Sequence, residues 1–119
     1  MGTHHNLVVL SGTVTLEPAL RELKGGVVLQ FDLSTALGEG STTSVPVAWH
    51  DPTPAQTSSF AAGDEVVVTG TVRRRFFRVG GQTQSRTEVI VASLIPARRK
   101  KSADSALAAA ANSIRPAVG

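Results

Sequence analysis

The chain has 119 residues, a length that fits one domain with a core of its own. It contains no cysteine, which excludes disulfides, thiolate metal ligands and a cysteine nucleophile. No apolar run approaches the roughly 20 residues of a membrane helix, and the N-terminus lacks the basic start and apolar stretch of a secretory signal. We therefore expect a soluble, cytoplasmic protein.

Charge is distributed unevenly along the chain. Residues 1–72 carry two basic and seven acidic residues, a net charge of −5, whereas residues 73–119 carry ten basic and two acidic residues, a net charge of +8. A positive half this concentrated indicates an anionic polymer or surface as partner. A solvated charged face is the alternative.

The first 96 residues are typical of strands separated by turns, because apolar and polar residues alternate between turn signals. Gly12 lies inside the first apolar run and indicates a bend or a close approach of two backbones. Gly80-Gly81 is expected at the tip of the last hairpin. Five strands are predicted in this way, over residues 6–16, 27–36, 42–50, 64–75 and 86–95.

One short helix is expected between the third and fourth strands. Thr53 suits the N-cap, Pro54 suits the first helical position and Gly63 suits the terminator, which predicts a helix over about 54–62 with Phe60 as its apolar anchor. The order β-β-β-α-β-β matches the all-β, five-stranded OB-fold barrel. A five-stranded SH3-like barrel would not place a helix there.

The composition changes after Pro96, where a basic run is followed by an alanine-rich segment. An isolated helix of about 12 residues is marginal in water. We therefore expect an OB-fold domain over residues 1–96 and a basic, alanine-rich tail over residues 97–119 that is flexible or partly helical.

A family resemblance rests on five segments in chain order, which together span about residues 6–96. They are Asn6 to Gly12 with Glu17-Pro18 and Arg21; Gly26 to Thr35; Val47-Ala48-Trp49; Phe60 to Gly70; and Arg73, Arg75, Phe77, Gly81, Arg86 to Val89 and Ile95. In this order they resemble bacterial single-stranded-DNA-binding proteins. The resemblance implies an OB fold, a homo-oligomer (dimer or tetramer), and binding of single-stranded DNA without strong sequence preference in replication, recombination or repair.

Three features depart from that family's pattern. The loop at residues 38–41 is short, Thr43 stands where the family often has a stacking tryptophan, and residues 112–119 form no acidic C-terminal tip. These departures favour a specialised paralogue.

Binding of single strands without sequence preference requires cations along the backbone path and flat groups on which bases stack. Phe31 and Phe60 are expected in the core, which leaves three aromatic candidates. Adjacent strand residues point to opposite faces, so at most one of Phe76 and Phe77 packs inward. The resemblance implies Phe77 as the stacking residue; a cap on the barrel end or an oligomer interface is the alternative.

Trp49 matches a stacking position of the family, but it also shares a face with Val45 and Val47, which permits a core position. His50 would contact phosphate or base, or is an ordinary surface histidine. Guanidinium groups bind phosphate bidentately and stack on bases. The predicted nucleic-acid-binding residues are therefore Trp49, Phe77, Phe76, Arg73, Arg74, Arg75, Arg78, Arg86, Lys24 and His50, with Arg21 as an extension of the same track.

No enzyme, metal site or cofactor is expected. The histidines His4, His5 and His50 have no evident nucleophile partner, and Gly80-Gly81 lacks the context of a phosphate-binding loop. Two other functions stay open. One is an OB-fold adaptor for protein assembly or replication restart with weak or no DNA binding, which the short loop and Thr43 favour and the charge asymmetry and Phe77 oppose. The other is an RNA binder of the cold-shock kind, which usually displays several aromatic residues on strands two and three, where only Trp49 is a candidate here.

Overall fold

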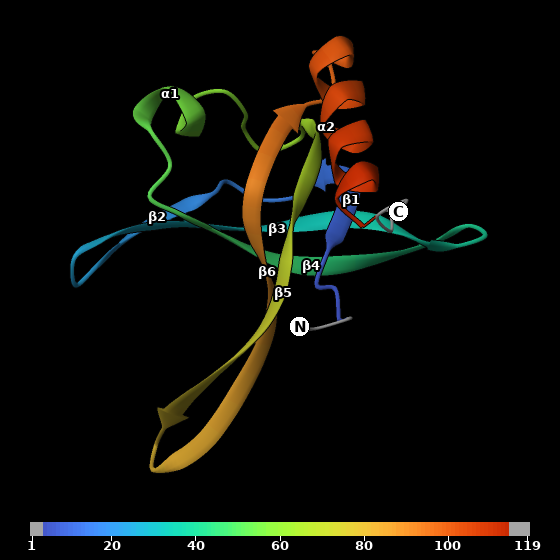
Figure 1. Cartoon of the computed structure of the whole chain (residues 1–119). Helices are drawn as coiled ribbons and strands as arrows, with labels where there is room; N and C mark the ends of the chain where they lie inside the picture. The colour runs from blue at the N-terminus through green and yellow to red at the C-terminus, as the bar shows by residue number, and fades with distance from the viewer. Residues whose placement is uncertain (1–3, 115–119) are drawn as a thin grey trace.

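The computed structural model describes residues 4–114. Figure 1 shows a strongly curved sheet with a long hairpin that projects from it and a helix against its opposite end. The elements in chain order are β1 (Val8–Val14), β2 (Ala19–Leu23), β3 (Gly26–Gly38), β4 (Ser41–His50), α1 (Pro54–Thr57), β5 (Glu65–Val79), β6 (Gln82–Pro96) and α2 (Lys100–Ser113).

Five of the strands close into a barrel. The sheet order is β1-β5-β6-β4-β3, and a further pairing between β1 and β3 joins its two ends. The contact between β4 and β6 is parallel, and the other pairings are antiparallel. Closure removes the open edges that a five-stranded sheet would expose. The predicted five-stranded barrel is thus confirmed, in a chain that is mostly β.

The count of strands was wrong by one, and this changes the place of the helix. Residues Ala19–Leu23 form an additional strand, β2, which pairs with the first part of β3. All five side chains of β2 are exposed, so the segment lacks the apolar alternation that reveals a half-buried strand. The short helix α1 therefore lies between the fourth and fifth strands of the chain.

Helix α1 begins as expected and ends early. The backbone N–H of Gln56 donates to Thr53 Oγ1 at 3.1 Å, and the Thr53 N–H donates to Gln56 Oε1 at 2.8 Å, which completes a capping box. The helix ends at Thr57 and not near residue 62. Phe60 lies beyond it but is still only 5% exposed, so it anchors this connection in the core.

With Thr13, Gly12 is one of two residues at which β1 pairs with both of its partner strands. It pairs with Val66 on β5 and with Thr35 on β3. A Cβ at Gly12 would collide with the carbonyl oxygen of Ser34. The close backbone approach expected at this glycine is thus confirmed, and it lies where the barrel closes.

The core fills the barrel with branched aliphatic side chains and three aromatic rings. Phe60 lies between Phe31, at a ring-centroid distance of 5.2 Å, and Trp49, at 6.4 Å. The buried cluster consists of Val14, Leu29, Phe31, Leu33, Val47, Trp49, Phe60, Val66, Val68, Val89, Val91 and Leu94.

The C-terminal segment is more regular than the sequence indicates. Helix α2 has 14 residues and lies against β5 and β6, with Ala103 and Ala110 buried. Residues 1–3 of the predicted domain and residues 115–119 of the predicted tail lie outside the described residues. Between residues 4 and 114, neither helix has the length and apolar character needed to cross a membrane.

Candidate nucleic-acid interface

Strands β5 and β6 continue beyond the barrel as a two-stranded ribbon. β1 pairs with β5 only as far as Gly70, and β4 pairs with β6 only at Val89 and Ile90. The outer parts of both strands, residues 73–88, therefore have no further strand beside them in the described chain, and Figure 1 shows them projecting away from the barrel. Gly80 and Gly81 both have positive φ, as a two-residue hairpin turn of this hand requires.

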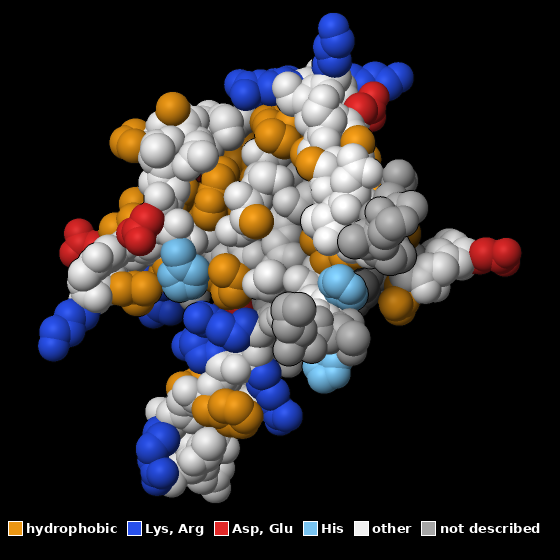
Figure 2. Space-filling view, viewed as in Figure 1, with side chains coloured by type: hydrophobic (Ala, Val, Ile, Leu, Met, Phe, Trp, Pro, Cys, Tyr) orange, Lys and Arg blue, Asp and Glu red, His pale blue; other side chains and the backbone are white. Residues whose placement is uncertain are grey.

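The register divides the ribbon's side chains between two faces, because directly paired residues point the same way. One face, which we call the groove face, carries Arg73, Arg75, Phe77, Gln84, Arg86 and Glu88. The other, which we call the far face, carries Arg74, Phe76, Arg78, Thr83, Ser85 and Thr87. The space-filling view in Figure 2 shows Lys and Arg side chains gathered around the projecting ribbon, with a second group at the start of α2.

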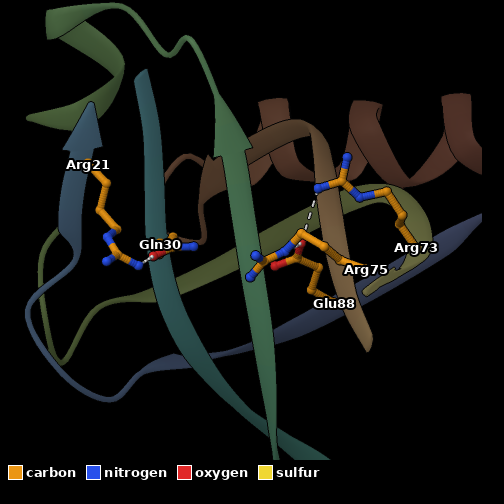
Figure 3. Close-up of polar contacts among 5 residues, drawn as sticks. All are labelled: Arg21, Gln30, Arg73, Arg75 and Glu88. Carbon is orange, nitrogen blue, oxygen red and sulfur yellow. Dashed lines mark hydrogen bonds and ion pairs between the residues drawn. The ribbon is translucent and has the colours of Figure 1, made fainter. Parts of the chain in front are cut away.

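A buried carboxylate holds two arginines of the groove face. Glu88 is only 3% exposed, and its Oε1 accepts from Arg73 Nη2 and from Arg75 Nε, each at 3.2 Å (Figure 3). A buried carboxylate is tolerated only when cationic donors compensate its lost hydration. Glu88 therefore restrains both guanidinium groups, whose side chains stay 46% and 40% exposed.

The groove face continues onto the barrel as a groove of about 330 Å³. In Figure 3, Arg21 on β2 lies on one side of this region and Arg73 and Arg75 lie on the other. Arg21 Nη1 donates to Gln30 Oε1 at 3.3 Å across the β2–β3 pair. The groove is lined by Arg21, Glu22, Leu23, Val28, Gln30, Ala48, His50, Arg73, Arg75 and Glu88.

The two phenylalanines of the ribbon lie outside the buried core and on opposite faces. Phe77 is half-buried, and the guanidinium carbon of Arg75 lies 5.3 Å from its ring centroid. Phe76 is 63% exposed, and the guanidinium carbon of Arg74 lies 5.1 Å from its ring. Each ring is therefore polarised by a cation on its own face.

Trp49 lies in the core at 7% exposure, where it packs on Phe60. Its neighbours Ala48 and His50 line the groove, so Trp49 points to the other side of β4, into the barrel. Trp49 therefore has the core position that its shared face with Val45 and Val47 permits. Its indole does not line the groove.

The other predicted residues are distributed around the groove. His50 is exposed at the end of β4 and lines the groove, whereas Lys24 lies in the exposed turn between β2 and β3 and does not line it. Arg86 Nη2 lies 3.9 Å from Asp32 Oδ1 on β3. Arg78, near the hairpin tip, donates to the Gly81 carbonyl at 2.8 Å.

Glu88 and Gln30 were missed as candidate site residues. A sequence signal existed for Glu88: once the turn is centred on Gly80-Gly81, an antiparallel hairpin places Glu88 opposite Arg73. No comparable signal exists for Gln30, because its contact with Arg21 depends on β2 being a strand.

Comparison with known proteins bears on the fold. No protein-family model and no curated protein sequence matches this chain. Among solved structures, it is similar to a chain described as "Plasmodium falciparum SSB complex with ssDNA", at 22% identity and a TM-score of 0.68, over 81% of this chain and 97% of that one. The protein therefore has the OB-type barrel fold of that single-stranded-DNA-binding protein.

Proposed function

We propose that this protein binds single-stranded DNA without strong sequence preference and carries out no catalysis. One observation carries the proposal: arginines flank a groove on the barrel surface, and the ring of Phe77 continues the same face along the ribbon. Binding of a single strand without sequence preference requires two elements, cations along the backbone path and an aromatic surface on which bases stack. The shared fold with a protein solved in complex with single-stranded DNA supports it.

In this proposal the strand crosses the groove with its phosphates toward Arg21, Arg73 and Arg75. A guanidinium group has five N–H donors. Contact with Glu88 uses only part of that set on Arg73 and Arg75, so further N–H groups stay available for phosphate oxygens. A base then stacks on Phe77, while His50 and Gln30 on the groove wall offer polar contacts that suit more than one base.

Homo-oligomerisation also belongs to the proposal. On β1, the Ser11 carbonyl accepts from Thr35 Oγ1, and the pairing with β3 begins at Gly12. Residues Val8–Leu10 pair with β5 alone. Their second backbone edge is therefore open in the described chain, and an open strand edge is a template for pairing with another copy. A protein of this kind would act wherever single strands are exposed, as in replication, recombination or repair, and would lie with the nucleoid in the cytoplasm.

A titration of oligothymidylate and of a matched duplex at several salt concentrations tests the function. We expect micromolar or tighter, salt-dependent affinity for the single strand and weaker binding of the duplex. Phe77→Ala should weaken single-strand binding by about 1–3 kcal/mol with an unchanged circular dichroism spectrum. Leu37→Ala, which removes a 67% exposed apolar side chain from another hairpin, is the control and should bind as the parent does. Equal affinity for both forms of DNA would refute the proposal.

A further inference from the structure

The far face of the ribbon has the components of a binding surface in its own right. Phe76 is 63% exposed, the Arg74 guanidinium lies over its ring, and Arg74 Nη2 donates to Ser85 Oγ at 3.0 Å. Ser85 is the direct cross-strand partner of Phe76. Arg74 and Ser85 thus hold a cation beside an accessible aromatic face, as Arg75 does beside Phe77 on the groove face.

The two faces differ in how far their cations are neutralised. On the groove face, the three arginines contact two carboxylates, Glu88 and Asp32, which leaves one net positive charge. On the far face, Arg74 and Arg78 donate to a hydroxyl and a carbonyl, and neither makes an ion pair within residues 4–114. The far face therefore carries two uncompensated positive charges, which attract phosphate, beside the more exposed of the two rings.

A ligand on one face cannot reach the other, because the hydrogen-bonded backbones of β5 and β6 lie between them. No other described strand pairs with the ribbon edges over residues 73–88. Both faces are accordingly accessible at the same time from opposite sides of the hairpin, which projects from the barrel in Figure 1.

We propose that the far face is a second surface for single-stranded DNA, so that one ribbon holds two separate segments, one on each side. The inference rests on the function proposed above. It extends that function from coating a strand to bridging two strands, or two parts of one strand. Arg74 and Arg78 contact phosphates, and a base stacks on Phe76, whose ring requires an unpaired base face.

A second copy of this chain fits the far face less well. In a symmetric contact the same patch meets itself, so Arg74 and Arg78 would face Arg74 and Arg78 of the other copy. The hydroxyl side chains that complete the face offer no negative charge to offset this repulsion.

Matched single substitutions on the two faces test the inference. The number of short oligothymidylates bound per chain is measured with the parent protein, Phe76→Ala and Phe77→Ala, together with the mass of each protein in solution. The oligothymidylates are about 4–8 nucleotides long, so that one DNA molecule does not span both faces of the ribbon. We expect two per chain for the parent and one per chain for each variant, with the lost site weakened roughly 5- to 150-fold.

A capture assay measures bridging directly. A labelled oligothymidylate is retained on beads carrying the same sequence only when protein joins the two. Phe76→Ala should reduce retention at unchanged oligomeric mass, and Arg74→Gln with Arg78→Gln should lower its salt dependence.

The second surface would be overturned if each parent chain bound one oligothymidylate and Phe76→Ala changed neither affinity nor capture. Single-strand binding at the groove would remain intact. A change in mass for Phe76→Ala would also overturn the second surface, by identifying the far face as an interface between copies. A parent protein that binds no single strand removes the proposed function, and this inference with it.

Discussion

Arg73 and Glu88 face each other directly across β5 and β6, with Arg73 Nη2 3.2 Å from Glu88 Oε1 at the root of the ribbon. Arg75 donates to the same oxygen from two residues further along β5. One buried carboxylate is therefore shared by two half-exposed guanidinium groups, and this arrangement couples the stability of the ribbon to the charge of the groove.

The shared carboxylate predicts that substitutions of the two arginines are not additive. Arg73→Ala and Arg75→Ala should each cost about 1 kcal/mol of unfolding free energy, because the other arginine still compensates Glu88. The double variant should lose about 3–5 kcal/mol, because a buried charge is then left without a cation. Urea denaturation of the four proteins measures the coupling.

Adding Glu88→Gln to the double variant provides the control for that cycle. It removes the uncompensated charge and should restore part of the lost stability. Losses that add within about 0.5 kcal/mol would show that the two arginines act independently on Glu88.

The position of Trp49 predicts a large effect on stability and a small one on fluorescence during DNA binding. Trp49→Ala should destabilise the protein by about 3–5 kcal/mol, because it leaves a cavity beside Phe60. Since Trp49 is the only tryptophan, its emission reports on this one site. The emission maximum should shift strongly to the red on unfolding and stay nearly constant when oligothymidylate binds.

Trp49→Phe is the matched control, since it keeps an aromatic ring in the core and should lose less stability than the alanine variant. Strong quenching of Trp49 by oligothymidylate in the folded protein would instead show that the indole reaches the bound strand.

The barrel closure at Gly12 predicts sensitivity to a single methyl group. Gly12→Ala should destabilise the protein by about 1–3 kcal/mol, because the new Cβ meets the Ser34 carbonyl and the backbones of β1 and β3 must separate. Thermal unfolding compared with Ser11→Ala, an exposed position next to it on β1, isolates the effect of the close approach. Equal melting temperatures for the two variants would contradict it.

Local signals in the sequence predicted much of the barrel correctly. Alternation placed β3 and β4, because one face of each of these strands must be apolar to be buried. The inner part of β5 was placed by a run of valines, which is buried on both faces. Thr53 and Pro54 located the start of α1 through hydrogen bonds within four residues. The arginines of the ribbon appeared in the sequence as a concentration of positive charge after residue 72.

Other features depend on which segments meet. The exposed strand β2 forms because its backbone pairs with β3. Backbone pairing by itself does not require a pattern of polar and apolar side chains, so the sequence did not indicate this strand. A helix of the length of α2 has marginal stability by itself in water. It forms here because it packs against β5 and β6, with Ala103 and Ala110 buried.

The sequence by itself determined a β-barrel with a basic hairpin, because alternation, turn residues and charge are local properties that do not need a partner segment. Only the tertiary structure decided which side of β4 faces the core, and so buried Trp49 and turned His50 outward. It also decided that Glu88 compensates two arginines of one face while Arg74 and Arg78 remain uncompensated on the other. The reason is that compensation depends on distances between strands, which pairing and barrel closure set.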